Sequence, residues 1–188
     1  MKTTIPTAAL CLAMAAAATP QALLDASADM PGVPSYTILQ ARGAIAVDGR
    51  MAEADWQSAP TVDFIFPWDD VSHVPAQSTK ARMLWDPGNL YILYECVDPY
   101  LHAEVTEHDG PVWEEDAVEI FVTPNPGNLN AYFGYEMNAR GTFLDYMAFN
   151  AGRERTEDIH FDWQSEGVEI ATTCEGTLND HSDRKSVV

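Results

Sequence analysis

Residues 111–124 read PVWEEDAVEIFVTP, and this stretch decides the fold. In its second half, β-branched residues occupy every second position from Val118 to Val122, the period of two that places alternate side chains on opposite faces of a strand. Trp113 and a run of acidic residues come just before this strand, where a loop meets the rim of a sheet. Such a rim can hold a polar ligand, and the same residues are also typical of an ordinary acidic turn.

Short strand patterns separated by Gly and Pro turns fill most of the remaining chain. Two hairpins are well defined, because turn residues join paired strand patterns, DPGN in the first and RG in the second. A single helical turn around Trp56 is expected to bury its indole. The sequence therefore predicts an all-β fold, an antiparallel β-sandwich of the jelly-roll-like kind. The expected strand regions are 36–47, 61–66, 79–85, 90–98, 117–123, 131–139, 142–150, 158–163 and 168–174.

The first 35 residues differ from the rest in composition. Residues 1–18 combine Lys2, an alanine-rich apolar run too short to span a bilayer and an A-x-A site, which predicts a signal peptide and export to the periplasm or the extracellular space. Residues 19–35 are small, polar and proline-punctuated, and we interpret them as a linker or loosely held arm.

The sandwich is expected over residues 36–183, followed by an atypical tail at 184–188. The tail reads RKSVV and offers little strand pattern where a last strand should close the second sheet. Our hypothesis is that the sequence is truncated or shifted in frame near Arg184, so that the sandwich lacks its last strand and exposes a sheet edge.

Charge and cysteine content narrow the class of function. The chain of 188 residues carries 29 acidic and 10 basic residues, a formal net charge of -19, which disfavours nucleic acid and anionic membrane surfaces as partners. We expect no membrane insertion, and 46% hydrophobic residues suffice for a sizeable core. Beyond the leader, Cys96 and Cys174 remain, either as a disulfide or as two free thiols.

Catalytic and metal motifs are sparse. The sequence has no G-x-S-x-G, and carboxylate pairs are inevitable among 29 acidic residues, so we assign no catalytic residue and expect no enzymatic activity from this domain by itself. The five histidines lack zinc-ligand spacing. Oxygen-rich turns suit calcium better, with Asp98, Asp109 and Asp116 among the candidate ligands.

Three tryptophans stand beside turns and among charges, namely Trp68, Trp113 and Trp163. Indole rings stack on the flat C–H faces of sugars, whose hydroxyl groups need charged or amide partners in fixed geometry. The polar side chains available for that purpose are those of Arg82, Glu119, Glu136 and Asn138. The alternative is that these indoles plug the ends of the sandwich.

Four segments in fixed order resemble family 9 carbohydrate-binding modules: IAVDGRMAEADWQSAP, TKARMLWDPGNLYILYECVDP, DGPVWEEDAVEIFVTP and YFGYEMNARGTFLDY. The resemblance covers residues 45–183. It implies an antiparallel β-sandwich of the kind attached to secreted xylanases and other glycoside hydrolases, which binds oligo- or polysaccharide such as xylan or cellulose, at chain ends in the best understood members. It further implies a structural calcium ion and no required cofactor.

The resemblance also implies residue roles. A sugar is held between two tryptophans, for which Trp68 and Trp163 are the candidates, and Arg82 is the accompanying arginine. Glu136 and Asn138 are the expected hydrogen-bonding partners. Trp113 and Glu119 belong to the strand motif of the family, either as structural residues or as ligand contacts.

Two other functions are weighed against this one. A related cytochrome-like sandwich would bind haem for electron transfer through Met83, Met137 or Met147 together with His102 or His160, and would show Soret absorption. A glycosidase would turn over an aryl glycoside and lose that activity on Glu119→Gln.

Overall fold

The computed structural model describes residues 34–64, 78–125, 127–149, 158–180 and 186–187. The chain divides into two compact units, Met1–Ser35 and Tyr36–Val188, and both sheets belong to the second. The predicted signal peptide, nearly all of the predicted arm, Trp68 and Arg184 lie outside the described residues. Among the described residues, no helix is long and apolar enough to cross a membrane.

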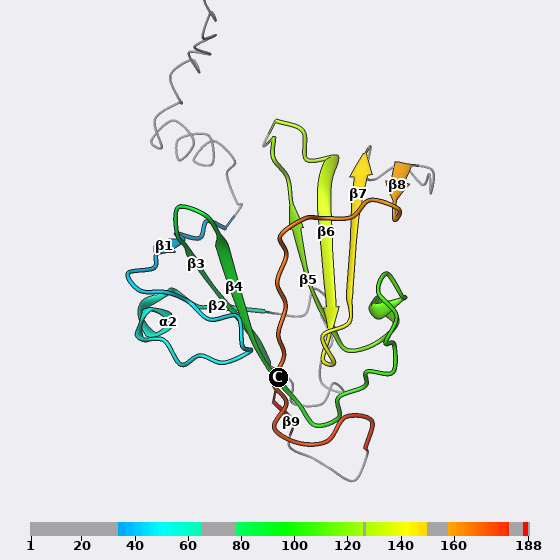
Figure 1. Ribbon diagram of the computed structural model, residues 1–188, viewed down its shortest axis with the longest axis horizontal. Coiled ribbons are helices and arrows are strands. Elements are labelled where there is room, and N and C mark those ends of the chain that lie inside the picture. Colours follow the sequence, from blue (N-terminus) through cyan, green and yellow to red (C-terminus); the bar gives the residue numbers. More distant parts are fainter. Residues whose placement is uncertain (1–33, 65–77, 126, 150–157, 181–185, 188) are drawn as a thin grey trace, which may run out of the picture. The chain divides into compact units, whose positions relative to one another are not determined.

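The first sheet, sheet A, is built on the first predicted hairpin (Figure 1). Its strands β3 (Ser78–Trp85) and β4 (Leu90–Asp98) pair along their whole length. The connecting turn is held by Asp86, whose Oδ1 accepts hydrogen bonds from the backbone N–H of Gly88 at 2.7 Å and Asn89 at 2.8 Å. Three two-residue strands complete the sheet: β1 (Leu39–Gln40) and β2 (Val62–Asp63) beside β3, and β9 (Ser186–Val187) beside the end of β4.

The second sheet, sheet B, is antiparallel throughout and has the order β5-β6-β7-β8. The second predicted hairpin forms its centre, where the turn between β6 and β7 uses Gly141 at a φ of 85°, a conformation that glycine adopts without strain. Between the sheets, the Tyr94 hydroxyl of β4 donates a 3.0 Å hydrogen bond to the Glu119 carbonyl of β5. The strands are β5 (Ala117–Val122), β6 (Ala131–Asn138), β7 (Phe143–Phe149) and β8 (Ile159–His160).

Register assigns every side chain of sheet B to one of two faces. Glu119 lies opposite Glu136, and Glu136 lies opposite Leu144, and directly opposed residues of antiparallel strands share a face. We name the two sides the Glu119 face and the Val118 face. The Glu119 face comprises Ala117, Glu119, Phe121, Tyr132, Gly134, Glu136, Asn138, Leu144, Tyr146, Ala148 and Ile159. The Val118 face comprises Val118, Ile120, Val122, Ala131, Phe133, Tyr135, Met137, Phe143, Asp145, Met147, Phe149 and His160.

Buried apolar residues form three separate clusters. The predicted helical turn is α2 (Ala54–Ser58), which packs on sheet A. Its Trp56 is buried against Leu84 of β3, as expected. On the Glu119 face of sheet B, Val112 from the 3₁₀ helix η1 (Val112–Glu114) packs on Leu144. The third cluster joins the loop that precedes η1 to the end of β6. The predicted all-β sandwich fold is confirmed.

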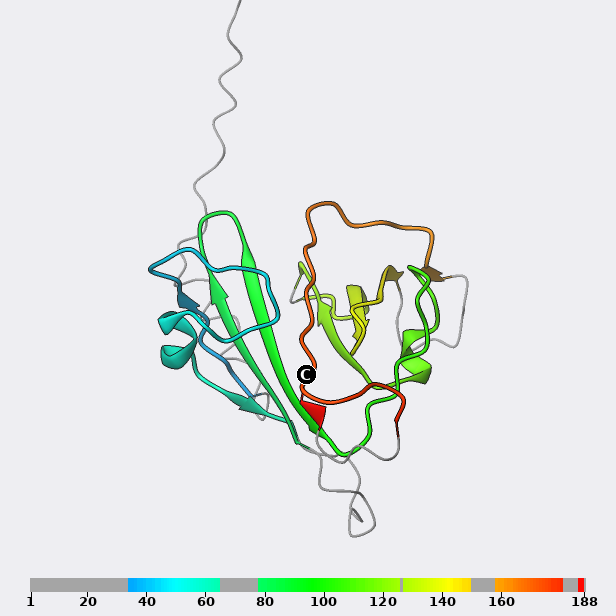
Figure 2. The ribbon, with the colours of Figure 1, turned by 60° about the horizontal axis from the view of Figure 1, so that its bottom comes forward.

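One expected strand does not join either sheet. Residues 168–174 pass between the sheets without ladder hydrogen bonds (Figure 2). Close packing on Gly49 holds them instead, because a Cβ at that glycine would come within 2.8 Å of the Thr172 carbonyl carbon, and the Thr173 hydroxyl donates a 2.6 Å hydrogen bond to the Gly49 carbonyl. Cys96 and Cys174 do not form a disulfide with each other.

Sheet A has an open edge beside this segment. β9 pairs only with Val97 and Asp98, so the described residues give the rest of β4 no ladder partner on the side away from β3. A cavity of about 850 Å³ lies here, lined by β4, β5 and residues 45–50 and 167–173. Whether a last strand is missing near Arg184 stays a prediction, because residues 181–185 and 188 lie outside the described residues.

Candidate functional site

A continuous strip of aromatic rings crosses the Glu119 face of sheet B. Its ring centroids are 6.3 Å apart between Trp113 and Phe161, 5.3 Å between Phe161 and Tyr146, 6.2 Å between Tyr146 and Tyr132, and 5.4 Å between Tyr132 and Phe121. Trp113, Phe161 and Phe121 are each about half exposed, whereas Tyr146 is buried. The aromatic strip therefore has a buried middle and exposed ends, and the exposed indole of Trp113 offers a face on which a flat apolar ligand face can lie.

The turn η1 presents Trp113 at one end of the strip. Val112 is fully buried and anchors the turn, while the next residue, Trp113, points outward and is 50% exposed. The turn is closed by backbone hydrogen bonds from Glu114 to Pro111 at 3.1 Å and from Glu115 to Val112 at 3.1 Å. A buried anchor next to an exposed indole fixes that indole at little further entropic cost.

Two carboxyl groups accompany the strip. Glu119 is exposed on β5, and Glu136 is its direct cross-strand partner on β6 but is only 6% exposed. Burial, followed by the nearby Glu119 charge, raises the pKa of the Glu136 carboxyl, and a hydrogen bond with Tyr146 opposes this shift. Among the described residues Glu136 Oε2 has no hydrogen-bond partner. This oxygen is itself fully buried, so the accessible carboxylate of the pair is that of Glu119.

Gly134 makes room for the middle of the strip. It lies opposite Tyr146 on the same face, and a Cβ at this position would come within 2.3 Å of the Tyr146 ring. The phenol therefore lies directly over the glycine, and its hydroxyl reaches Glu136. A side chain at residue 134 would displace both.

Asn138 supports the loop rather than the surface of the face. Its Nδ2 donates to the Val105 carbonyl at 3.0 Å and to Glu115 Oε2 at 2.8 Å, and its Oδ1 accepts from the N–H of Arg140 and Thr142. The side chain is 1% exposed, so its amide has no group left for a ligand.

Glu115 belongs to the same support. Burial raises the pKa of its carboxyl, but the hydrogen bonds from Asn138, Val105 and Glu104 outweigh that effect and hold the pKa below its ordinary value. An ionised, fully bonded carboxylate at this point fixes the loop that leads into η1.

The structure does not bring all the predicted site residues together. Trp113, Glu119, Glu136 and Asn138 share the Glu119 face or its rim. Trp163 contacts the opposite Val118 face, with its ring centroid 4.9 Å from that of Phe133.

Arg82 belongs to sheet A, where its guanidinium forms an ion pair with Glu95. The other half of the predicted clamp, Trp68, is outside the described residues.

The predicted calcium ligands separate into two places. Asp116 accepts a 2.7 Å hydrogen bond from the His102 N–H, and burial, followed by the Asp98 charge, raises the pKa of its carboxyl. Asp109 instead lies beside His108 and Asp145. Among the described residues, this second group is the one whose ligand atoms converge.

One feature of sheet B bears on the alternative that the protein binds haem. Register pairs Met147 with His160 directly across β7 and β8. These two side chains stand next to each other on one face, whereas axial ligands approach a haem iron from opposite sides.

Sequence reasoning missed Phe161, Tyr146, Tyr132 and Phe121 as members of the site. Phe121, Tyr132 and Tyr146 lie within the predicted strands, but only the pairing of β5, β6 and β7 shows that the three side chains share one face. Phe161 follows β8 and is placed only by tertiary packing on Tyr146.

The geometry suits binding better than bond cleavage. Glu119 and Glu136 lie side by side in neighbouring strands of one sheet face, with Cβ atoms about 5 Å apart. A glycosidase instead places its two carboxyl groups on opposite sides of the scissile bond. The exposed indole of Trp113 and the exposed carboxylate of Glu119 can contact a polyhydroxylated ring.

Comparison with known families and proteins points the same way. The model of a family described as carbohydrate family 9 binding domain-like matches residues 47–178, more than half of the chain. No solved structure gives a significant match.

Several curated proteins are similar to part of the chain. Endo-1,4-beta-xylanase A of Thermotoga neapolitana is 26% identical over 123 residues, which cover 58% of this chain and 11% of that protein. Endo-1,4-beta-xylanase A of Thermotoga maritima is 32% identical over 75 residues, 40% of this chain and 7% of that protein. Endo-1,4-beta-xylanase C of Paenibacillus barcinonensis is 29% identical over 115 residues, 61% of this chain and 10% of that protein. The chain thus matches about a tenth of the length of these relatives.

Proposed function

The chain belongs to the carbohydrate family 9 binding domain-like family, and on this premise we propose that it binds oligo- or polysaccharide on the Glu119 face of sheet B without cutting it. One observation carries the choice of face. A half-exposed indole, Trp113, lies in the same aromatic strip as Tyr146, whose hydroxyl is bonded to the buried carboxyl of Glu136.

The proposed mechanism combines stacking with hydroxyl recognition. The C–H face of a sugar ring covers the exposed end of the strip at Trp113 and Phe161, removing apolar surface from water. Sugar hydroxyls donate to the exposed carboxylate of Glu119, a charge-assisted bond that is stronger than one between neutral groups, while the buried Glu136 positions the Tyr146 ring through their hydrogen bond. Loss of either half leaves the other too weak to hold the ligand.

The ligand class and context extend this proposal. The relatives are named endo-1,4-beta-xylanases, and the chain spans a small part of each. We propose that the ligand is a xylan- or cellulose-type sugar, bound at chain ends. The domain acts as an accessory to a glycoside hydrolase in a longer parent protein, exported by the leader at residues 1–18.

Calorimetric titration with xylobiose and cellobiose tests the ligand and the face together. Trp113→Ala is expected to abolish saturable binding, whereas Trp85→Ala, which removes a 40% exposed indole from sheet A, is expected to leave it unchanged. Equal binding by the wild type and Trp113→Ala, in samples with matching circular dichroism, would sink the assignment of the face.

Two further arms decide the finer points. Borohydride-reduced disaccharides should not bind if recognition is at chain ends, and equal affinity for reduced sugars would show recognition along the chain. Trp163→Ala and Arg82→Ala test the clamp that the family resemblance implies, because these residues lie away from the Glu119 face. Loss of binding in these variants, with Trp113→Ala unaffected, would move the site to the clamp residues.

A further inference from the structure

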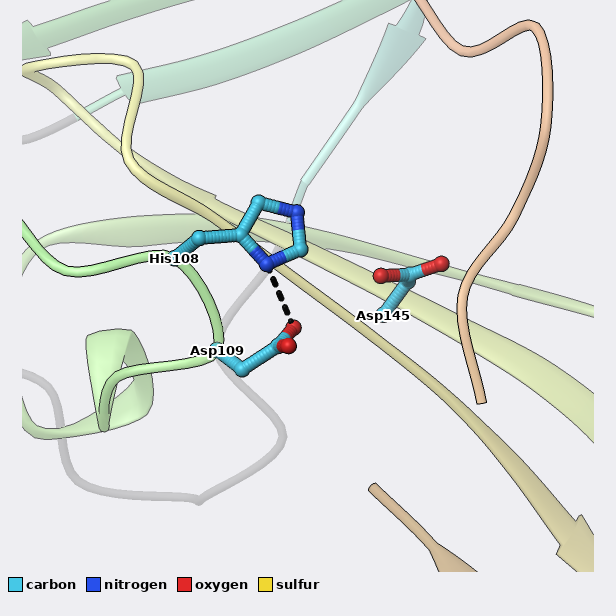
Figure 3. Close-up of side chains that lie close together, drawn as sticks. All are labelled: His108, Asp109 and Asp145. Carbon is cyan, nitrogen blue, oxygen red and sulfur yellow. Dashed lines mark ion pairs between the residues drawn. The ribbon is translucent and has the colours of Figure 1, made fainter. Parts of the chain in front are cut away.

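We propose that His108, Asp109 and Asp145 form a binding site for a divalent cation of the borderline class, such as Zn²⁺ (Figure 3). The ligand atoms of the three side chains lie within 4.8 Å of one another. Two of the residues come from the loop before η1 and the third from the middle of β7, so the site exists only in the folded chain.

The backbone fixes the two carboxylates relative to each other. The N–H of Asp109 donates a 3.0 Å hydrogen bond to the Phe143 carbonyl, which ties the loop to β7 two residues before Asp145. Asp109 adopts a φ of 61°, a left-handed conformation that is uncommon outside glycine and that turns its side chain toward β7.

In Asp109 and in Asp145, one carboxylate oxygen accepts no hydrogen bond from the described residues. Asp145 is 1% exposed, and its Oδ1 is buried without a hydrogen-bond partner among the described residues. Asp109 Oδ1 is also buried, and its described contact is His108 Nδ1 at 2.9 Å. Burying an unpartnered carboxylate oxygen is costly unless a cation or a donor reaches it.

The second oxygen of each carboxylate accepts a hydrogen bond from the segment 164–165. Gln164 Nε2 donates to Asp109 Oδ2 at 2.6 Å, and the Ser165 N–H donates to Asp145 Oδ2 at 2.5 Å. This division matches a metal site, in which outer hydrogen bonds orient carboxylates whose inner oxygens coordinate. In the part of the chain that the structure describes, no lysine or arginine forms an ion pair with either carboxylate.

The donor set selects the kind of cation. An imidazole nitrogen with two carboxylate oxygens suits Zn²⁺ and similar metals, whereas Ca²⁺ takes oxygen ligands alone. Metal–ligand bonds of about 2.0–2.2 Å bring ligand atoms to roughly 3.5 Å from one another, and the half-exposed His108 has the freedom to close the remaining gap. Three protein ligands leave a fourth position for water.

The consequence of binding is structural. The cation joins the loop before η1, strand β7 and residues 164–165, the segment that follows Trp163 directly. Asp145 lies on the Val118 face, so this site is separate from the proposed sugar surface on the Glu119 face. It also differs from the place of Asp116, whose pKa is raised by burial and by the charge of Asp98.

The test uses the full chain after removal of metal by chelation, with calorimetric titration of Zn²⁺, Mn²⁺ and Ca²⁺ as their chlorides. We expect a single Zn²⁺ site, weaker Mn²⁺ binding, and no Ca²⁺ binding at this group. Asp145→Asn and His108→Gln should each weaken Zn²⁺ binding by at least about tenfold, since even loss of an outer partner costs that much. Co²⁺ in place of Zn²⁺ should give visible absorption bands that the variants lose.

A matched control comes from a second His–Asp pair. His160 and Asp162 are exposed and 3.9 Å apart, so His160→Gln removes a histidine next to an aspartate without touching the site. Zn²⁺ binding should survive this change. Circular dichroism checks the fold of each variant, and His108→Gln decides the outcome if Asp145→Asn does not fold, because His108 is more than half exposed.

Three results would overturn the proposal: no Zn²⁺ binding by the wild type, binding that persists undiminished in His108→Gln, or Ca²⁺ bound more tightly than Zn²⁺ at this group. None of these results bears on sugar binding, which is tested separately by comparing the wild type with Trp113→Ala.

Discussion

Gly134→Ala gives a sharp test of how the proposed sugar surface is built. The new Cβ would lie 2.3 Å from Tyr146 Cζ, 2.6 Å from Cε1 and 2.7 Å from the hydroxyl, where ordinary contacts are about 3.5–4.0 Å. The phenol must therefore move by more than about 1 Å. It is 7% exposed and packed by Tyr132 and Phe161, so it has little space to move.

The expected cost is set by this overpacking. Extra carbon in a well-packed core costs typically about 1–3 kcal/mol, and the crowding at Tyr146 places Gly134→Ala at the upper end. For a chain of this size, about 3 kcal/mol lowers Tm by roughly 6–12 °C. Displacement of the Tyr146 hydroxyl also breaks its hydrogen bond with Glu136 and disorders the strip, so affinity for xylobiose should fall together with stability.

Thermal melting followed by circular dichroism measures the first effect and calorimetric titration the second. Gly43→Ala is the matched control, because a Cβ there has its nearest neighbour, Asp55 Oδ2, at an ordinary 3.8 Å. A loss of less than about 0.5 kcal/mol in Gly134→Ala, the range of an uncritical surface substitution, would refute the packing of Tyr146 over Gly134. A destabilised variant with unchanged sugar affinity would refute the role of Glu136.

Four further predictions follow from the same structure. Glu136→Gln should be more stable than the wild type at neutral pH and should lose that advantage in acid. Because the folded-state pKa of Glu136 is raised, the stabilisation of the wild type by the protonated carboxyl is complete below the unfolded-state pKa and is lost as pH rises through the folded-state pKa. Thermal melting of both proteins across a pH series measures the difference. Leu144→Ala, at a fully buried position of the core on the Glu119 face, should cost about 2–5 kcal/mol in denaturant unfolding, and a cost below 1 kcal/mol would contradict the packing on Val112. Structural calcium, which the family resemblance implies, should raise Tm when Ca²⁺ is added to metal-free His108→Gln, and an unchanged Tm would remove calcium from the account. Purified protein should show no Soret band, and its presence would favour the haem alternative.

Local sequence determined the parts of the fold in which neighbours in sequence are also neighbours in space. The DPGN turn fixes the β3–β4 hairpin through Asp86, and Gly141 fixes the β6–β7 hairpin, so both were predicted to within a few residues. Trp56 was likewise buried by its own helical turn as expected.

Alternation in residues 117–123 predicted a two-faced strand, but only pairing decided what each face carries. Glu119 meets Glu136 because of the β5–β6 register, and the aromatic strip forms because β7 and the residue after β8 bring Tyr146 and Phe161 to the same face. No local pattern specifies such long-range packing.

The tertiary structure alone decided three other outcomes. Residues 168–174 have a strand pattern, yet close packing on Gly49 takes the place of a ladder. Asn138, expected to contact sugar, uses its whole amide to hold the loop around Glu115. Asp109, a candidate calcium ligand from the sequence, lies beside His108 and beside Asp145, 36 positions along the chain, and calcium binding there stays a prediction. The local sequence determines which side chains each strand and turn carries. The pairing of distant strands determines which of these side chains lie together, because that pairing depends on burial and on satisfying hydrogen bonds across the whole fold.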